Sequence, residues 1–387
     1  MKSSRALPII IISQFACTSL WFAGNAVVDD LAHKTGMGQE IVGYLISSVQ
    51  LGFISGTLLF SLFMVADRFS PSRVFAICAI LAAFCNLILI SDDLSASQVL
   101  AARFGTGFFL AGIYPVGMKI AADYYEQGLG KALGWLVGAL VLGTALPYFI
   151  SGTSWGRSYT LVVKTTSFLS FSGGLLLYAF VPNGPFRKLS NRLRLGAGTS
   201  LFKLPEFRKA AFSYFGHMWE LYAFWAFTPF AIDTYNSLSG NTFSLPLVTG
   251  IIIALGAFSC VFGGIISQHW GSKTVVSIAL LVSGCFCLVS PFLFHLPYFL
   301  FLLGWGLWGM AVVADSPQCS NLVASAAPIE LRGTALTLVN CLGFAISIVS
   351  IELLSFLMYK INSTLLFLPL SMGPLFGLWQ ISRRKYQ

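Results

Sequence analysis

The sequence has 387 residues, of which 56% are hydrophobic and only 10% are charged. A water-soluble domain carries about 25% charged residues, and the mean hydropathy here is +0.80. This composition excludes an ordinary soluble protein and indicates a membrane protein. The net charge is +9. The positions of the basic residues along the chain decide whether this charge indicates a nucleic-acid partner or the orientation of the protein in the membrane.

Twelve apolar segments are long enough to cross a bilayer, because a helix needs ~20 residues to span ~30 Å of hydrocarbon. They lie near residues 8–28, 42–66, 74–91, 98–120, 132–152, 160–181, 210–232, 246–267, 274–294, 297–325, 333–357 and 363–381. Several run well beyond strand length without alternation, which argues against a β-barrel. The sequence predicts an all-α membrane protein with twelve transmembrane helices. The first segment has no clear cleavage site, so we expect it to be retained.

The basic residues lie mostly on one side of the predicted membrane. Nearly all fall at the end of an even-numbered span or the start of an odd-numbered one, and the other side holds only Lys34, Arg157, Lys164 and Lys360. Because Lys and Arg are enriched in cytoplasmic loops, this predicts a multi-pass protein of the inner (plasma) membrane with both termini in the cytoplasm. The basic residues therefore indicate how the protein is oriented in the membrane, and we expect no nucleic-acid partner.

The sequence shows no sign of enzymatic or cofactor chemistry. Its eight cysteines form no CxxC pair and join no His cluster at metal-ligand spacing, so we expect reduced packing residues and no metal. Neither GLGKAL (128–133) nor WGSKT (270–274) supplies the GxxxxGK[ST] pattern of a phosphate-binding loop. The sequence therefore predicts a protein that is not an enzyme, has no cofactor and is not driven directly by nucleotide.

One long polar connection divides the spans into two sets of six. We expect an N-terminal half over residues 1–182, a cytoplasmic linker over 183–206 and a C-terminal half over 207–387. Four marks recur at near-constant offsets of 201, 199, 199 and 202 residues: Asp67 with Gln268, Gly105 with Gly304, Gly107 with Gly306, and Pro115 with Pro317. Tandem six-helix halves are typical of transporters with a substrate site near the membrane midplane.

The loop after the second span, MVADRFSPSRV (64–74), carries a recognisable signature. It resembles the G-x-L-a-D-R-x-G-R motif of the Major Facilitator Superfamily through Ala66, Asp67, Arg68 and Arg73. It departs from that motif with Phe63 and Ser70 at the two glycine positions and with an inserted Pro71. ELRGTAL (330–336), which contains Arg332, is also typical of the superfamily. The resemblance covers essentially the whole chain, is nearest to bacterial metabolite and anion carriers, and leaves the subfamily open.

The resemblance implies a secondary transporter that works by alternating access, with a cytoplasmic gate at these motifs. Its gating residues are Asp67, Arg68, Arg73 and Arg332. A carboxylate at a helix end can also hold a neighbouring basic residue, and breaking that contact would open the gate. The alternative for Asp67 is a solvated loop charge that only helps topology.

His217 and Glu220 interrupt an apolar, aromatic stretch, SYFGHMWELYAFWAF (213–227). Glu220 lies ~15 Å into its span at 1.5 Å per residue, close to mid-membrane. An ionised carboxylate facing lipid there is costly, so Glu220 must face a cavity, pair with a cation or bind a proton. Tyr214, His217 and Glu220 share one broad helical face. We expect His217 and Glu220 to take part in proton coupling; the alternative is an interhelical hydrogen bond without a transport role.

Three further charged residues lie in or near spans. Arg103 is followed by Gly105, Gly107 and Gly112 and resembles the superfamily's span-four motif, which implies proton coupling or gating; the alternative is a side chain that extends to the outer surface. Asp315, two residues before Pro317, is a further proton-coupling candidate or a cytoplasmic helix-end charge. Lys119 either contacts substrate or extends to the inner surface.

Aromatic and amide side chains suggest a substrate site. In the superfamily, spans one, four, seven and ten line the central cavity, and the residues there that we expect to contact substrate are Gln14, Trp21, Asn25, Tyr114, Lys119, Tyr222, Trp225, Trp305 and Trp308, together with Asn340. Such a wall suits a small molecule with an apolar body and an ionisable group. The alternative is bundle packing and interfacial belts, which use the same residues.

These observations predict a proton-coupled secondary transporter of a small organic ion. Arg103 and Lys119 favour an anion. Its partners are the small-molecule substrate, protons and the lipid bilayer, and we expect a monomer. Two alternatives remain: efflux of amphipathic drugs or metabolites by proton exchange, and a membrane sensor or scaffold with the same fold.

Overall fold

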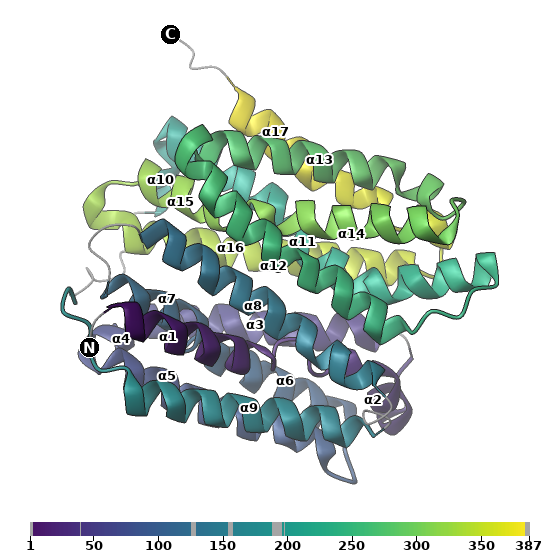
Figure 1. Ribbon diagram of the computed structural model, residues 1–387, viewed down its shortest axis with the longest axis horizontal. Coiled ribbons are helices and arrows are strands. Elements are labelled where there is room, and N and C mark those ends of the chain that lie inside the picture. Colours follow the sequence, from purple (N-terminus) through teal and green to yellow (C-terminus); the bar gives the residue numbers. More distant parts are fainter. Residues whose placement is uncertain are drawn as a thin grey trace. The chain divides into compact units, whose positions relative to one another are not determined.

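The computed structural model describes residues 3–38, 40–124, 129–153, 158–187, 196 and 198–383. Its ordered elements are helices, with no strand among these residues (Figure 1). The predicted all-α membrane fold is therefore confirmed. Part of the predicted linker, residues 188–195 and 197, lies outside the described residues.

The chain forms long helices joined by short connections. The α-helices are α1 (Ser3–Thr18), α2 (Val28–Thr35), α3 (Ile41–Leu62), α4 (Val65–Arg68), α5 (Pro71–Leu87), α6 (Ala96–Leu110), α7 (Tyr114–Ala122), α8 (Leu129–Gly152), α9 (Tyr159–Phe180), α10 (Gly198–Lys203), α11 (Pro205–Ser239), α12 (Leu245–Trp270), α13 (Ser272–Leu293), α14 (Tyr298–Ala314), α15 (Ser316–Ala326), α16 (Arg332–Leu357) and α17 (Met372–Ser382). Short 3₁₀ helices are η1 (Asn25–Val27), η2 (Ile88–Ile90), η5 (Ile329–Leu331), η6 (Ser363–Leu365) and η7 (Leu368–Ser371).

Within the described residues, 10 helical segments are long and apolar enough to cross a membrane. Each ends within a few residues of a predicted span. The two other predicted spans correspond to α1, whose apolar part Ala6–Thr18 is shorter, and to α11, which is 35 residues long. Together these account for the twelve predicted transmembrane segments.

Local sequence explains where several helices begin. Ser95 and Gln98 form a capping box at the start of α6, with each side chain bonding the other residue's backbone N–H. Proline lies in the first turn of α5 and of α11, where its missing N–H has no helical partner to lose.

Several predicted spans are not continuous helices. α1 ends at Thr18 and turns separate it from η1. α6 ends at Leu110 and α7 begins at Tyr114, while α14 and α15 are separated at Asp315. Pro115 and Pro317 each stand in the first turn of the second helix, and a proline inside a helix removes one backbone hydrogen bond. The last two breaks therefore share a proline at the same position, in the first turn of the following helix.

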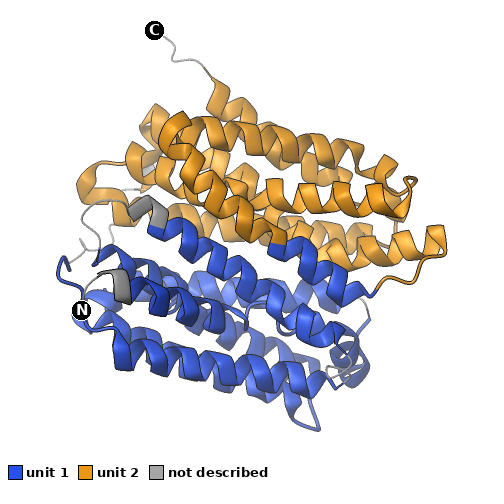
Figure 2. Cartoon of the chain, in the orientation of Figure 1, with its two compact units in different colours: residues 1–190, 244–254 blue, residues 191–243, 255–387 orange. Residues whose placement is uncertain are grey.

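The first compact unit comprises residues 1–190 and 244–254 (blue in Figure 2). In it, α3 packs on α6, α5 on α6 and α9, and α1 on α8 and α9. The α3 and α6 backbones touch, because a Cβ at Gly107 would lie 1.9 Å from the Val49 carbonyl oxygen and one at Gly52 would lie 2.0 Å from that of Phe104. Only glycine permits this approach.

The second compact unit comprises residues 191–243 and 255–387 (orange in Figure 2). Here α11 packs against α14, α15, α16 and α17, and α13 packs against α14 and α17. α11 is buried along most of its length, which explains why its few polar side chains meet other helices.

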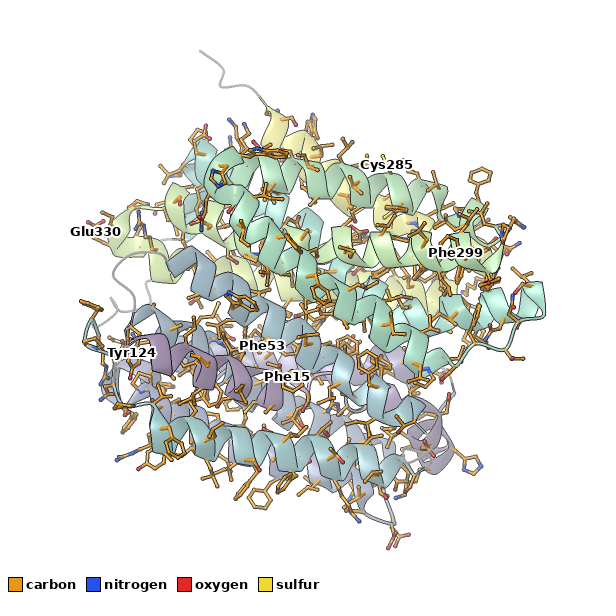
Figure 3. The ribbon with its side chains drawn as sticks, in the orientation of Figure 1. Phe15, Phe53, Tyr124, Cys285, Phe299 and Glu330 are labelled. Atoms are coloured by element: carbon orange, nitrogen blue, oxygen red, sulfur yellow. The ribbon has the colours of Figure 1, made fainter. Side chains whose placement is uncertain are left out.

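Large apolar side chains cover the outward faces of many helices. Phe168 on α9, Phe258 on α12, Phe292 on α13 and Phe299 on α14, the last labelled in Figure 3, are all exposed. A soluble protein rarely exposes so many large apolar groups. These faces suit contact with lipid.

Candidate functional site

Glu220 lies inside the second unit and is only 1% exposed. The Trp308 indole nitrogen donates to Glu220 Oε1 at 2.6 Å. The Cys287 thiol lies 3.2 Å from the same oxygen, and the Ser283 hydroxyl lies 2.5 Å from both carboxyl oxygens. Among the described residues, no Lys, Arg or His side chain forms an ion pair with Glu220. The carboxyl group is thus enclosed by neutral donors and does not face lipid.

His217 and Asp315, both predicted as proton-coupling residues, lie together. His217 Nδ1 is 2.8 Å from Asp315 Oδ1, and both side chains are 2% exposed. On the other side of the ring, Nε2 lies 2.8 Å from the Ser316 hydroxyl. Which of these groups donates depends on the tautomer of the ring. An aspartate, an imidazole and a hydroxyl therefore lie next to one another at the α14–α15 break, although Asp315 Oδ1 accepts no hydrogen bond from the described residues and meets His217 only at ion-pair distance.

The helical spacing of α11 presents these groups to different neighbours. Tyr214 donates its hydroxyl to Asn340 Oδ1 on α16 at 2.7 Å. One turn later His217 meets the α14–α15 break, and Glu220 meets α13 and α14. Residues three apart share a broad face of a helix, so one face of α11 carries all three contacts.

Sequence reasoning missed the residues that complete these contacts. Ser283 and Cys287 are four residues apart on α13 and both are buried, whereas Cys285 between them is exposed (Figure 3). Their spacing marks an inward polar face, which could have been found. Nothing local to α13 indicates Glu220 as the acceptor. Ser316, next to the predicted Asp315, was also missed.

Arg103 occupies the interior of the first unit. It is fully buried, so its side chain does not extend to the outer surface. One guanidinium nitrogen donates to the carbonyl oxygens of Leu20 at 3.1 Å and Trp21 at 2.5 Å, and another to Asn86 Oδ1 at 3.2 Å. Asn86 in turn bonds to Thr166 and other groups on α9. All partners of the guanidinium are neutral.

Asp67 does hold a basic residue, as the gating hypothesis requires. The partner is Lys119 on α7, whose Nζ lies 2.7 Å from Asp67 Oδ1. Arg187 donates to the backbone carbonyls of Asp67 and Phe69 at 2.8 and 2.9 Å. Arg68, Arg73 and Arg332, the other predicted gating residues, are exposed. Asp123 follows α7, and burial raises the pKa of its carboxyl while the charges of Lys119 and Arg187 oppose that shift.

The predicted substrate residues of the first unit lie in different surroundings. Gln14 is fully buried, and neither its amide nitrogen nor its oxygen has a hydrogen-bond partner among the described residues. Asn25 donates to the Val42 carbonyl oxygen. Trp21 packs against Phe53 with ring centroids 5.0 Å apart. Tyr114 and Lys119 are half-buried.

The predicted aromatic residues of the second unit form buried clusters. Trp305 and Trp308 are fully buried, with ring centroids 5.1 Å apart. Tyr222 and Trp225 are also buried, with ring centroids 5.5 Å apart. Substrate contact by these residues stays a prediction, and Trp308 has the additional role of a Glu220 partner.

Comparisons with known proteins place these features in a family. The family model described as Major Facilitator Superfamily matches residues 9–351. The crystal structure of the human organic anion transporter MFSD10 (TETRAN) is similar with a TM-score of 0.72 and 15% identity, covering 99% of this chain and 100% of that one. The nucleoside transporter NupG, in a mutant form, is similar with a TM-score of 0.70 and 15% identity, covering 97% and 98%. A search of curated proteins finds no match.

At 15% sequence identity, these two similar structures show only that the fold is shared. The family match is independent of them and extends over most of the sequence, including the loop with Asp67 and the span with Glu220. The resemblance predicted from the sequence is confirmed: the chain belongs to the Major Facilitator Superfamily, a family of membrane transporters.

Proposed function

We propose that this protein is a secondary transporter that couples the movement of a small organic ion, with an anion favoured, to protons. Membership of the superfamily supports secondary transport in general. The proton coupling is supported by one observation above all: Glu220 is fully enclosed, accepts from three neutral donors and has no cationic partner among the described residues. A buried carboxyl without a counter-ion is readily neutralised by a proton.

The pair of His217 and Asp315 supports a second place for the proton. His217 lies one helical turn before Glu220 on α11, and its Nδ1 is 2.8 Å from Asp315 Oδ1 at the α14–α15 break. An imidazole changes its charge near neutral pH more readily than other side chains. In this proposal Glu220 binds the coupling proton and the His217 and Asp315 pair receives or returns it.

The preference for an anion rests on Arg103. Its guanidinium is always charged in ordinary conditions, yet its hydrogen-bond partners among the described residues are carbonyl and amide oxygens, with no carboxylate. This leaves positive charge in the interior of the first unit. Lys119 contributes less to the argument, because Asp67 already balances it. The name of the human relative, an organic anion transporter, agrees with this preference.

Solute-driven proton movement tests the proposal. The purified protein is placed in sealed vesicles with an internal pH dye, and a panel of small organic anions, nucleosides and organic cations is applied in turn. Acidification of the interior on inward solute movement indicates symport, and alkalinisation indicates the alternative of efflux by proton exchange. Neither solute flux nor proton movement with any member of the panel would favour a sensor or scaffold.

Glu220→Gln tests the proposed proton site. The variant keeps the size of the side chain but cannot bind and release a proton, so solute-coupled proton movement should be abolished while exchange of solute at equal concentrations is partly retained. Glu352→Gln on α16 is the matched control, since Glu352 is a second span carboxyl that is only partly buried, and it should keep the coupling. Normal coupling in Glu220→Gln would remove this residue from the role.

A further inference from the structure

Trp308 holds a fixed position beside Glu220. Its ring is fully buried and packs against Phe224 at 4.8 Å, Trp305 at 5.1 Å and Phe367 at 5.9 Å between ring centroids. Because the ring is enclosed by other aromatic rings, its N–H has a defined direction, and that direction is toward Glu220 Oε1 at 2.6 Å.

The bond between Trp308 and Glu220 depends on the charge of the carboxyl group. An indole can only donate a hydrogen bond, and a bond to an ionised acceptor is roughly twice as strong as a neutral one. The Ser283 hydroxyl, which contacts both carboxyl oxygens, can either donate or accept. It can therefore accept the proton of a neutral Glu220, while Trp308 keeps only a weaker bond to the remaining carbonyl oxygen.

We propose that Trp308 is the positioning residue through which α14 responds to the protonation of Glu220. With an ionised carboxyl, the charge-assisted bond ties α14 to α11. When Glu220 binds a proton, this tie weakens and α14 becomes freer to move. The inference rests on the proposed function, in which Glu220 is the proton site, and adds the residue that transmits its state.

Other ionisable groups near Glu220 are few within the described residues. Cys287 on α13 touches the carboxyl, and Asp315 lies at the α14–α15 break. His217 lies one turn away on α11. Neither α16 nor α17 presents a charged side chain to Glu220, so the Trp308 bond is not masked by a stronger ion pair.

The α11 helix and the α14–α15 segment are joined at a second level, where His217 meets Asp315. The groups around that contact are Ser316, Cys260 on α12 and Cys319 on α15. The helix α11 is thus attached to this segment at two levels, by Glu220 to Trp308 and by His217 to Asp315.

An infrared pH titration tests the role of Trp308 without a ligand. The carbonyl stretch of the protonated Glu220 carboxyl is followed in lipid-embedded protein and assigned by its loss in Glu220→Gln. Trp308→Phe keeps an aromatic ring but removes the N–H donor that favours the ionised form. The midpoint should move to higher pH by about one to two units, a 10- to 100-fold change in proton concentration, if the bond is worth what charged hydrogen bonds typically are.

Trp305→Phe is the matched control. Trp305 lies one turn away on the same helix and is equally buried, but its indole nitrogen has no hydrogen-bond partner within the described part of the chain. Its replacement should leave the midpoint of the Glu220 titration unchanged, whatever it does to the transport rate. Equal shifts in the two variants would show a general packing effect and overturn the proposal.

A measurement on the unaltered protein guards against variants that fail to fold. Ultraviolet resonance Raman bands that report indole N–H hydrogen bonding should change with pH at the same midpoint as the Glu220 carbonyl band. If the Glu220 band titrates but the indole bands do not follow, or Trp308→Phe leaves the midpoint in place, the role of Trp308 is wrong and the proton site stands. If Glu220 does not titrate between acid and alkaline pH, both proposals fail.

Discussion

Arg103 illustrates how one residue stabilises the interior of the first unit. Replacement by Met would leave the Leu20 and Trp21 carbonyls and Asn86 Oδ1 without their donor. Hydrogen bonds to charged groups are worth about 1.5–3 kcal/mol each, so we expect Arg103→Met to lose about 3 kcal/mol or more of stability. Thermal unfolding followed by intrinsic fluorescence measures this.

Two further variants make the Arg103 test specific. Arg103→Lys keeps the charge but offers no planar fork, so it should restore only part of the stability. Arg208→Met, at an exposed position of α11, should leave the melting temperature unchanged. A melting temperature of Arg103→Met equal to that of the unaltered protein would contradict the proposed contacts.

At the scale of single residues, the sequence predicts which side chains need an explanation but not what surrounds them. Glu220 was expected to be shielded because of its depth, and it is. Its partners Ser283, Cys287 and Trp308 lie 63 to 88 residues away in the chain, and no local pattern joins such distant positions. Lys119 is predicted to contact substrate or to extend to the inner surface; it pairs with Asp67, and substrate contact stays a prediction.

The ion pair of Asp67 and Lys119 joins two elements, α4 and α7. Both side chains are partly exposed, so the pair should contribute only about 0–1 kcal/mol to stability. We expect Asp67→Asn and Lys119→Gln each to change the transport rate by a similar factor, and the double variant to do no worse than either single one. A double-mutant cycle on initial transport rates measures the coupling.

The same cycle separates gating from substrate binding at Lys119. If Lys119 binds substrate, its replacement raises KM and Asp67→Asn does not. If the pair forms a gate, the two variants change the same parameter in the same direction. Independent, additive effects would contradict a gate made by this pair.

The packing of α3 on α6 makes a second prediction for elements. A Cβ at Gly107 would lie 1.9 Å from a backbone oxygen of Val49, which cannot move without moving α3. At Gly306, its counterpart in the internal repeat, the nearest contact is the flexible Leu255 side chain at 3.1 Å. We therefore expect Gly107→Ala to prevent folding or lower the melting temperature strongly, and Gly306→Ala to have little effect. Yield and thermal unfolding measure both, and equal behaviour of the two variants would contradict this account.

Helix positions follow closely from the hydropathy pattern, but helix continuity does not. The predicted spans 98–120 and 297–325 match the structure at their ends and miss their breaks. Pro115 and Pro317 were the available signals, yet proline can also bend a helix without ending it. The break after Thr18 has no proline near it, so the apolar run through residue 28 concealed it.

The whole molecule consists of two units that share one internal feature. In the first unit the helix pair α6 and α7 breaks before Pro115, and in the second the pair α14 and α15 breaks before Pro317. This agrees with the repeat inferred from offsets near 200 residues. The proposed division into residues 1–182, 183–206 and 207–387 stays a prediction, because much of the connection lies outside the described residues.

The orientation of the chain in the membrane is a prediction at the same scale, and its physical basis is the placement of basic residues. The segment around Gly196 is flanked by Arg187, Lys203 and Arg208, whereas the loop of residues 240–244 between α11 and α12 contains no Lys or Arg. Because basic loops are retained in the cytoplasm, we expect a fluorescent reporter to be active at residue 196 or after residue 387. We expect alkaline phosphatase, which needs export, to be active only in the 240–244 loop. The reverse pattern would invert the topology, and with it the side from which Asp67 and Lys119 could act as a gate.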